Sequence, residues 1–306
     1  MPSRSFPRFK ELVSSDRQSI ERLTAAFPPY SDYTFASLLS WNTGSAVEWS
    51  VLRDNLAVRF NGYVPDQLPF YSLLGTTEVD AAVAELLALG AGADGDSALR
   101  LVPAVVVEQI NDRGRYRIEE DPDHHDYVFR TSDLVDCAGA GFAAKRKRVN
   151  RFLRSHGRAT HVATLDLADH QTGRDMVAVF AAWEQSRSLE REHTGDELDA
   201  IQRLLRSAPD LDLIGVGVFV EGGLKAFSIL EVSGDFGVAH FEKADVSYVG
   251  IFPFLKQQVA TKLRELGCEF VNYEQDLGLP GLRREKRSWR PALYLKKYVV
   301  SPAPAF

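Results

Sequence analysis

Three apolar segments that follow one another through short turns constrain the fold most strongly. They are expected as strands over Asp212–Val220, Leu224–Val232 and Phe236–Asp245, and each turn between them contains glycine. Glycine-containing connections of a few residues between strand-like stretches are typical of antiparallel hairpins. The sequence therefore predicts an antiparallel meander in the second half of the chain.

Helix-like and strand-like segments on both sides extend this meander into a mixed α/β domain. The expected helices cover Asp175–Ser188, Asp196–Ser207, Gly250–Leu266 and Gly281–Trp289, and the expected strands Thr160–Leu165, Glu269–Tyr273 and Leu293–Val300. The first half has a looser version of the same order, with helices at Glu78–Leu89 and Phe142–His156 and a short helix or strand at Ala104–Ile110. A chain of 306 residues has the length of two average domains, so we expect domains at 1–157 and 158–306, the second carrying the active site.

Cysteine content and hydropathy exclude several classes of protein. Cys137 and Cys268 are the only cysteines, which excludes a disulfide scaffold and a cysteine-rich zinc module, and we expect both to be buried. The longest apolar runs, Leu101–Val107 and Leu213–Val220, are too short to cross a bilayer. The first residues lack the apolar stretch of a secretory signal. We expect a soluble cytoplasmic protein without an integral membrane segment.

Positive charge is concentrated in two segments of an acidic chain. The net charge is −6, yet Lys145–Arg158 and Arg283–Lys297 together hold fourteen basic residues and one acidic residue. Two solvated helix faces would explain such segments, but both lie beside aromatic residues, as in proteins that contact phosphate backbones. We therefore expect a phosphate-bearing partner that binds at these segments.

Common nucleotide and hydrolase motifs are missing. The dipeptide Gly-Lys of the phosphate-binding loop does not occur, nor does a G-x-S-x-G elbow. Gly139–Ala144 fits G-x-G-x-x-A but follows a helix start instead of a strand, so it is interpreted as a turn that lets the basic helix approach its neighbour. The contiguous Asp and His residues of Asp121–Asp126 favour a solvated loop over a metal site. No cofactor and no metal are expected.

Two segments have the composition of a reactive site. In His240–Asp245, strand alternation would place His240 and Glu242 on one face and Lys243 and Asp245 on the other. In Asn272–Lys286, a strand delivers polar residues to its C-terminal end, where a basic helix begins. A purely structural network of ion pairs is the alternative for each segment.

These segments carry a family resemblance. Asn272-Tyr273-Glu274-Gln275-Asp276-Leu277-Gly278, together with His240–Asp245, Asp126–Arg130 and the basic segment from Lys145, resembles the DUF2156 family, which is akin to the C-terminal domain of phosphatidylglycerol lysyltransferases. The resemblance implies a tandem GNAT fold, an α/β (α+β) arrangement of two acyltransferase-like domains with mixed, largely antiparallel sheets. It also implies transfer of an aminoacyl group from aminoacyl-tRNA to an amine or a hydroxyl.

The resemblance further suggests roles for individual residues. Gly281-Leu282, Lys286 and Trp289 are similar to a pattern in the Fem peptidyltransferases, which assigns Lys286 to stabilise the tetrahedral intermediate. Asp276 and Glu274 are candidates for holding the α-ammonium of the donor or taking the proton of the acceptor, with Glu242 and His240 as second choices for the base. The candidate substrate contacts are Tyr273, Gln275, Lys243, Asp245 and Arg283, and the candidate tRNA contacts are Lys145, Arg146, Arg148, Arg151, Arg154, Arg287 and Arg290.

The segment before the expected helix Gly250–Leu266 bears on the identity of the acyl donor. Coenzyme-A-dependent GNAT enzymes bind pyrophosphate with a glycine-rich loop that has no counterpart before Gly250–Leu266. An aminoacyl-tRNA donor needs cationic helices instead. The expected function is thus aminoacyl transfer from aminoacyl-tRNA to a small amine, hydroxylamine or hydroxyl acceptor, or to a lipid headgroup. A coenzyme-A-dependent N-acyltransferase and a non-catalytic RNA- or partner-binding module are the alternatives, and the amino acid, the acceptor and the oligomeric state stay open.

Overall fold

The computed structural model describes residues 6–44, 46–63, 67–92, 96–186 and 194–304. The chain forms two compact units. The first consists of Met1–Asp126, Gln275–Pro280 and Tyr294–Phe306, and the second of Tyr127–Glu274 and Gly281–Leu293. The backbone therefore passes from one unit to the other four times, and each unit is described by itself below.

This division differs from the continuous ranges 1–157 and 158–306 expected from the sequence. Residues 127–157 belong to the second unit because their apolar side chains, such as Phe152, pack in the core of that unit. Strand β14 (Lys297–Pro302), near the C-terminus, belongs to the first unit because it hydrogen-bonds to two strands of that unit. Pairing between such distant segments leaves no local pattern from which a boundary could be placed.

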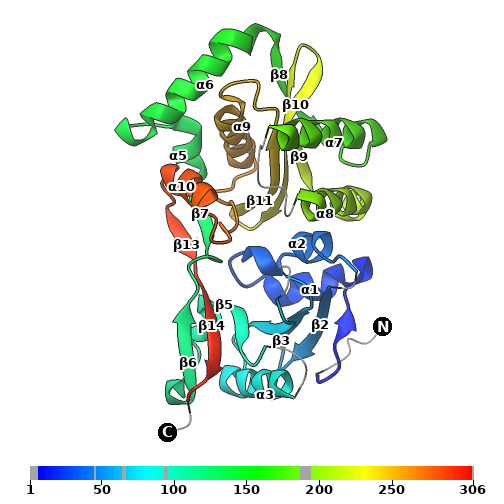
Figure 1. Ribbon diagram of the computed structural model, residues 1–306, viewed down its shortest axis with the longest axis vertical. Helices are drawn as coiled ribbons and strands as arrows, with labels where there is room; N and C mark the ends of the chain where they lie inside the picture. Colours follow the sequence, from blue (N-terminus) through cyan, green and yellow to red (C-terminus); the bar gives the residue numbers. More distant parts are fainter. Residues whose placement is uncertain (1–5, 45, 64–66, 93–95, 187–193, 305–306) are drawn as a thin grey trace. The chain divides into compact units, whose positions relative to one another are not determined.

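The first unit is built on a mixed sheet that has seven strands in the described part of the chain (Figure 1). The strand order is β1-β2-β3-β4-β5-β14-β6. Neighbouring strands are antiparallel, except for the parallel pair β4 and β5. The strands other than β14 are β1 (Lys10–Glu11), β2 (Val47–Leu52), β3 (Asn55–Phe60), β4 (Phe70–Leu74), β5 (Leu99–Pro103) and β6 (Tyr116–Glu120).

Helix α3 covers this sheet with the face that its sequence predicts. The helices of the first unit are α1 (Arg17–Thr24), α2 (Phe35–Ser40), α3 (Val79–Ala91) and α4 (Ala104–Val107). The apolar residues at helical spacing in α3, from Val79 to Leu87, are buried in one core with residues of β4 and β5. The segment expected as a short helix or strand at Ala104–Ile110 begins as helix α4.

The second unit contains the predicted meander. Its sheet, also seven-stranded over the described residues, has the order β13-β7-β12-β11-β10-β9-β8. The strands are β7 (Asp126–Arg130), β8 (Thr160–Leu165), β9 (Ile214–Val220), β10 (Gly223–Ser233), β11 (Phe236–Ala244), β12 (Phe270–Asn272) and β13 (Leu293–Leu295). Antiparallel pairing of β9 with β10 and of β10 with β11 confirms the meander, and Gly222 and Gly234 have the positive φ that its turns require.

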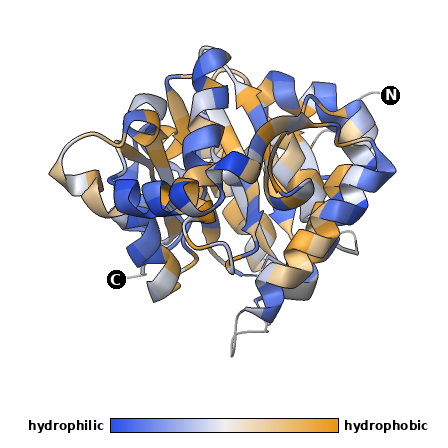
Figure 2. Ribbon diagram, turned by 90° about the horizontal axis from the view of Figure 1, so that it is seen from above, coloured by the Kyte–Doolittle hydropathy of each residue, from blue (hydrophilic) through white to orange (hydrophobic). Residues whose placement is uncertain are grey.

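The two layers of helices in the second unit lie on opposite faces of this sheet (Figure 1). The helices are α5 (Thr131–Asp136), α6 (Ala143–His156), α7 (His170–Gln185), α8 (Thr194–Ser207), α9 (Ile251–Glu265) and α10 (Pro280–Ser288). Helices α5, α6 and α9 share one core, whereas α7 and α8 pack on the other side. Figure 2 shows hydrophilic and hydrophobic residues mixed along the helices, as expected for elements with one face toward a core.

Strands β11 and β12 pair over a short distance and then part. Their parallel register runs from Phe236/Phe270 to Val238/Asn272, after which β12 ends while β11 continues to Ala244. The residues that follow these last pairs are those with the composition of a reactive site.

The strand expected at Leu293–Val300 is two strands in different sheets. β13 belongs to the sheet of the second unit and β14 to that of the first, with Lys296 between them. The continuous apolar pattern contains no signal for this change of sheet. Apart from this division, the predicted mixed α/β fold with largely antiparallel sheets is confirmed.

Two expectations from composition can be compared with the structure. Cys137 and Cys268 are buried and form no disulfide, and burial raises the pKa of both thiols. Within the described residues, no helix combines the length and the apolarity needed to cross a bilayer.

Candidate active site

A hydrogen-bonded network lies at the C-terminal end of β12 in the second unit. Tyr273, the residue after this strand, donates its hydroxyl hydrogen to Glu242 Oε1 at 3.0 Å. Lys256 of α9 donates to the other oxygen of this carboxylate at 3.1 Å, and its ammonium lies 3.0 Å from the centroid of the Tyr273 ring. Burial lowers the pKa of Lys256 and raises that of Tyr273 well above its usual value. The Glu242 carboxylate is thus held by two donors from different elements.

His240 occupies a β-bulge, which corrects the expectation from strand alternation. The pairing of β10 with β11 shifts between Ile229 and Leu230, so that His240 is an extra residue on β11. A bulge turns the side chain of the extra residue away from its alternating position. His240 therefore contacts Glu231 of β10 and does not join the Glu242 network. No local sequence pattern indicates such a bulge.

Two carboxylates surround the His240 ring. Its Nδ1 lies 3.0 Å from Glu274 Oε1, and its Nε2 lies 3.3 Å from Glu231 Oε1. Burial alone would lower the pKa of His240, but the two carboxylates outweigh burial and raise the pKa to about 10. At neutral pH this ring is an imidazolium that holds the Glu274 side chain in place.

Lys286 reaches the same strand end from α10. Its ammonium donates to the main-chain oxygen of Tyr273 at 2.5 Å and lies 5.7 Å from the centroid of the Tyr127 ring. Glu274, the next residue, has a left-handed φ of 57°, and its main-chain N–H donates to Asn272 Oδ1 at 2.7 Å. Of the candidates, Glu242 and Lys286 thus both contact Tyr273, whereas the carboxylate of Glu274 pairs with His240.

Lys243 and Asp245 are not part of this arrangement. Lys243 is buried beneath α7 and α8, where its ammonium lies 2.6 Å from Glu197 Oε1 and 4.1 Å from the centroid of the Trp183 ring. Asp245 Oδ1 accepts hydrogen bonds from the main chain and the hydroxyl of Ser247. These two candidate substrate contacts stabilise packing and a turn, whereas Arg283 lies half-buried on α10.

Gln275 and Asp276 belong to the first unit. Gln275 Nε2 donates to Asp32 Oδ1 at 3.1 Å and contacts the Tyr63 hydroxyl. Asp276 is fully buried, and its Oδ1 accepts the Gly278 main-chain N–H at 2.9 Å, the bond of an Asx turn. The string that carries the family resemblance thus has partners in the second unit up to Glu274 and in the first unit from Gln275 onward.

Sequence reasoning missed a buried ion cluster in the first unit. Lys297 has no exposed surface and pairs with Asp126 at 2.7 Å and with Asp32. Ser31 donates its main-chain N–H and its hydroxyl hydrogen to Asp126 at 2.8 and 2.6 Å. Burial opposes the charge on Lys297, but the two carboxylates raise its pKa above the usual value. The only available signal was that Asp126 and Lys297 are charged residues beside strand-like apolar residues, which need partners when they are buried.

Two of the seven candidate tRNA contacts are engaged inside the second unit. Lys145 is buried, donates to Glu285 Oε1 at 2.7 Å and lies 4.5 Å from the centroid of the Trp289 ring. Burial lowers the pKa of Lys145. The Arg146 guanidinium donates to main-chain oxygens that follow α5, those of Cys137 and Gly139. These two side chains join elements of the unit and do not form part of a free basic surface.

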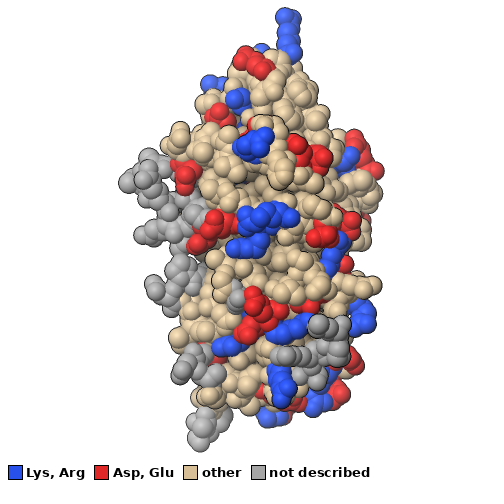
Figure 3. Space-filling view, turned by 90° about the vertical axis from the view of Figure 1, so that its right-hand side faces the viewer, with Lys and Arg blue, Asp and Glu red and all other residues tan. Residues whose placement is uncertain are grey.

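The other five candidate tRNA contacts are exposed, namely Arg148, Arg151, Arg154, Arg287 and Arg290. The two basic segments lie in contact, because Lys145 of the first pairs with Glu285 of the second. A Cβ at Gly141, just before α6, would lie 2.1 Å from the Arg290 guanidinium carbon. Residues 140–142 form a 3-10 turn, and Ala143 and Ala144 already belong to α6, so this glycine segment leads directly into the basic helix. By contrast, the face drawn in Figure 3 shows basic and acidic side chains interspersed.

Helix α6 also covers the N-terminus of α9. A Cβ at Gly250, the N-cap of α9, would lie 2.2 Å from the main-chain oxygen of Arg148, and Gly250 has a φ of 97°. The rings of Phe152 and Phe254 are 4.9 Å apart. The first turn of α9 therefore faces the main chain of α6 and an aromatic ring.

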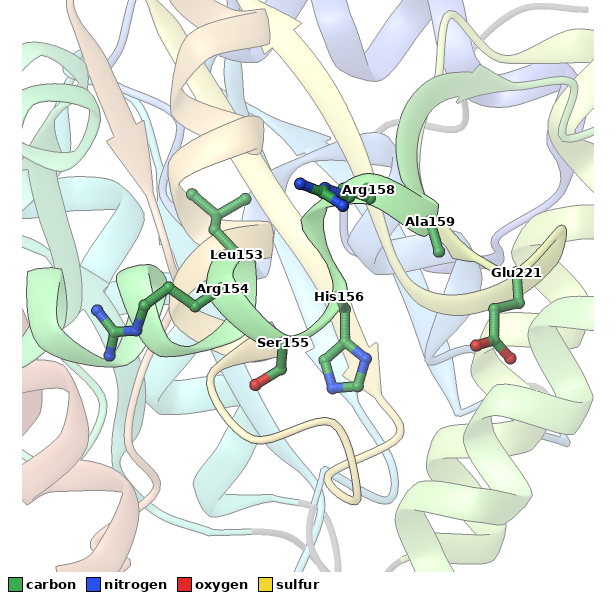
Figure 4. A pocket seen from close by; sticks show the side chains of 7 residues that line it. All are labelled: Leu153, Arg154, Ser155, His156, Arg158, Ala159 and Glu221. Atoms are coloured by element: carbon green, nitrogen blue, oxygen red, sulfur yellow. The ribbon is translucent and has the colours of Figure 1, made fainter.

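A cavity of about 360 Å³ lies at the C-terminal end of α6 (Figure 4). Its walls come from residues 153–156, 158 and 159 and from Glu221, so that arginine and glutamate side chains both line it. None of the candidate catalytic residues lines this cavity. Among the residues that the structure describes, no three His, Cys, Asp or Glu side chains are grouped to hold a metal ion.

Comparison with known proteins identifies the family. Residues 24–301 match the model of the family described as phosphatidylglycerol lysyltransferase, C-terminal. The chain belongs to this family. The resemblance inferred from the sequence is therefore confirmed, and membership supports an acyltransferase in general terms. A comparison with curated proteins gives no significant match.

Three solved structures are similar over nearly the whole chain. A conserved protein of unknown function from Bacteroides thetaiotaomicron VPI-5482 is 25% identical, with a TM-score of 0.83 over 96% of this chain and 99% of that one. The DUF2156 C-terminal domain of a putative lysylphosphatidylglycerol synthetase from Agrobacterium fabrum is 13% identical, with a TM-score of 0.62 over 94% and 91%. FemX is 10% identical, with a TM-score of 0.59 over 95% and 96%. The chain therefore shares its fold with that DUF2156 domain and with FemX.

Proposed function

We propose that this chain is an aminoacyltransferase that takes its aminoacyl group from aminoacyl-tRNA. The acceptor is a small amine, hydroxylamine or alcohol, or a lipid headgroup. The observation that carries the proposal is the position of α6, whose packed side covers the N-terminus of α9 and whose exposed side bears arginines. The names of the family and of FemX agree with an aminoacyl donor.

The covered helix terminus argues against coenzyme A. Helix N-termini bind phosphate groups through free main-chain N–H groups and the helix dipole. The main-chain oxygen of Arg148 and the Phe152 side chain already stand at the N-terminus of α9. A pyrophosphate would have to displace α6, whereas an aminoacyl-tRNA needs no such cradle.

The exposed side of α6 suits an RNA backbone. Arg148, Arg151 and Arg154 recur every three residues and are exposed. Residues at this spacing are neighbours on a helix surface, so the three guanidinium groups can follow successive phosphates. Arg287 and Arg290 extend the positive charge from the second basic segment, which contacts the first.

The strand end at Tyr273 supplies groups for the transfer step. The nucleophilic nitrogen or oxygen of the acceptor attacks the ester carbonyl carbon, and the bond to the tRNA 3′ oxygen breaks. We assign Lys286 to stabilise the oxyanion. Its ammonium donates to the Tyr273 main-chain oxygen at rest, and in the transition state it would donate to the more negative oxygen of the tetrahedral intermediate. The acceptor proton ends on the leaving 3′ oxygen. His240 already carries both ring protons and is not the base.

The carboxylates then divide the remaining roles. Glu274 is only partly buried and is oriented by His240, so we assign it to the α-ammonium of the aminoacyl group. Glu242 positions Tyr273 through its hydroxyl. Asp276 shapes the turn before α10 through its bond to Gly278.

The decisive experiment incubates the purified protein with a total pool of charged tRNA and a panel of amine and alcohol acceptors. We expect one class of aminoacyl-tRNA to be discharged, and ribonuclease to abolish the reaction. Transfer from acetyl-coenzyme A or longer acyl-coenzyme A that ribonuclease leaves unchanged would establish the coenzyme-A-dependent alternative. Binding of tRNA without discharge, in the presence of extracts that contain the acceptor, would indicate an RNA-binding module.

The docking surface has its own test. Arg148→Glu combined with Arg151→Glu should raise the KM for tRNA about tenfold or more and flatten its salt dependence, because two phosphate contacts are removed. Arg206→Glu, on an exposed position of α8, is the matched control and should leave KM within about twofold. An unchanged KM in the double variant would remove α6 from the tRNA interface.

A further inference from the structure

Among the strands that the structure describes, β8 (Thr160–Leu165) has no neighbour on its outer edge. β8 is the last strand of its sheet and pairs with β9 in an unbroken antiparallel register from Thr160/Val220 to Leu165/Gly215. His161, Val162 and Thr164 are exposed. The outer edge of such a strand presents main-chain N–H and C=O groups that another strand can pair with.

The other sheet edges carry the usual protection. β1 has two residues and β13 has three, which is too short for extended pairing. β6 bears the charged residues Arg117, Glu119 and Glu120. Short edges and charged edges both oppose the addition of a strand. β8 has six residues and contains no Lys, Arg, Asp, Glu or Pro and no register shift.

We propose that β8 is the surface through which two copies of this chain associate, by antiparallel pairing of β8 with β8 across a two-fold axis. An isologous contact of this kind uses the same surface on both copies. An uncharged strand has no charge with which to select a different protein, and in a symmetric pair it brings no like charges together.

The residues of the strand are complementary to themselves about Val162. When the axis passes through Val162, residues equally distant before and after it face each other. Thr160 then faces Thr164 of the second copy. The Thr160 hydroxyl donates to the His156 main-chain oxygen at 2.8 Å, so it would accept a hydrogen bond from Thr164, and Thr–Thr pairs stabilise antiparallel strands. Just beyond the strand ends, Arg158, in the 3-10 turn before β8, comes near Asp166 of the second copy, and both side chains are exposed. By symmetry, this pair of opposite charges forms twice.

The first test measures association of the full chain by sedimentation velocity over a concentration series. The wild-type chain should reach a monomer–dimer equilibrium. Val162→Lys places two ammonium groups against each other at the axis and should raise the dissociation constant about tenfold or more. Val232→Lys is the matched control, because Val232 lies in the same sheet and is 40% exposed, against 39% for Val162. It should leave the dissociation constant unchanged.

The second test examines the register. Arg158→Glu and Asp166→Arg should each weaken the dimer, and the double variant should restore the dissociation constant to within about twofold, because the two charges are only exchanged. Amide hydrogen exchange in β8 should slow as the protein concentration rises.

Either test can overturn the proposal. A wild-type chain that stays monomeric throughout the series, or a dimer that Val162→Lys leaves intact, would exclude β8 as the interface. A double variant no better than the single variants would exclude the axis at Val162. Thermal unfolding of each variant shows that it is folded, and neither outcome depends on the identity of the acyl donor.

Discussion

The two units each contain a buried network of charges, but the networks are placed differently. In the first unit, Lys297 and the carboxylates of Asp32 and Asp126 are almost completely buried and come from three distant parts of the chain. In the second unit, Glu242 and Lys256 meet Tyr273 where two strands part, and Lys286 reaches the same residue with a half-buried side chain.

We interpret the enclosed network as stabilising the fold and the partly exposed network as a place for chemistry. A fully enclosed ion cluster is strongly destabilised when one partner is removed, because the remaining charges cannot be solvated. Substitution of a partly exposed group beside a strand end lowers the free energy of unfolding less, because water solvates what remains. Such a group can also give up a protein partner and bind a substrate instead. We therefore expect substitutions in the first network to change stability and substitutions in the second to change activity.

The largest effect on stability should follow Lys297→Met. The change leaves Asp32 and Asp126 without their common cation and should cost about 3–5 kcal/mol in the free energy of unfolding, measured with denaturant. Lys296→Met is the control, since Lys296 is 46% exposed, and should leave the free energy of unfolding nearly unchanged. If Lys297→Met lowered the free energy of unfolding as little as the control does, the enclosed cluster would not stabilise the first unit.

Lys286→Ala should reverse this pattern. We expect kcat for aminoacyl transfer to fall about 10²-fold, because one donor to the oxyanion is lost. The free energy of unfolding should fall by less than about 1.5 kcal/mol, because the Tyr273 carbonyl loses a single hydrogen bond. Denaturant unfolding of the same preparation gives its stability. If Lys286→Ala lowered the free energy of unfolding as much as Lys297→Met does, the proposed difference between the two units would be wrong.

His240 should make the second unit sensitive to alkaline pH. Because its pKa is raised to about 10, the folded state retains a proton that the unfolded state releases near pH 6.5. The stabilisation is complete below pH 6.5 and is lost as the pH rises toward 10. Denaturation curves across this range should show the decline, and His240→Gln should remove this part of it. An identical pH dependence in the variant would contradict the imidazolium between two carboxylates.

The smallest effect should follow Tyr273→Phe. The change removes one hydrogen bond to Glu242 while Lys256 still holds the carboxylate, so the expected loss is about 1 kcal/mol. Tyr298→Phe, at a half-buried position in the other unit, serves as the control for removal of a hydroxyl. A loss above about 3 kcal/mol would place the second network in the same class as the first.

Local patterns predicted the elements of the fold well. The meander followed from glycine turns between apolar stretches, and α3 from apolar residues at helical spacing. The place of β14 in the first unit was not predictable from the sequence. Hydrogen bonds to β5 and β6 place this strand there, and its own composition does not indicate them.

The candidate site was predicted in part, for a similar reason. Lys286 meets Tyr273 because the residues after a strand and those of the next helix are close in the chain, whereas Glu242 reaches Tyr273 from β11, the neighbouring strand. The bulge at His240 and the burial of Lys145 depend on partners far away in the sequence, so alternation and charge counts misplaced both. The Lys297 cluster needs residues separated by most of the chain.

The position of β14 has a consequence for synthesis on the ribosome. Because β14 lies between β5 and β6 and supplies Lys297, the first unit cannot complete its sheet until nearly the last residues have been made. The second unit has all but its final strand by residue 293 and can acquire its core earlier. The first unit therefore stays incomplete while the rest of the chain is made, and a chain that stops short of residue 297 lacks both the strand between β5 and β6 and the cation that pairs with Asp32 and Asp126.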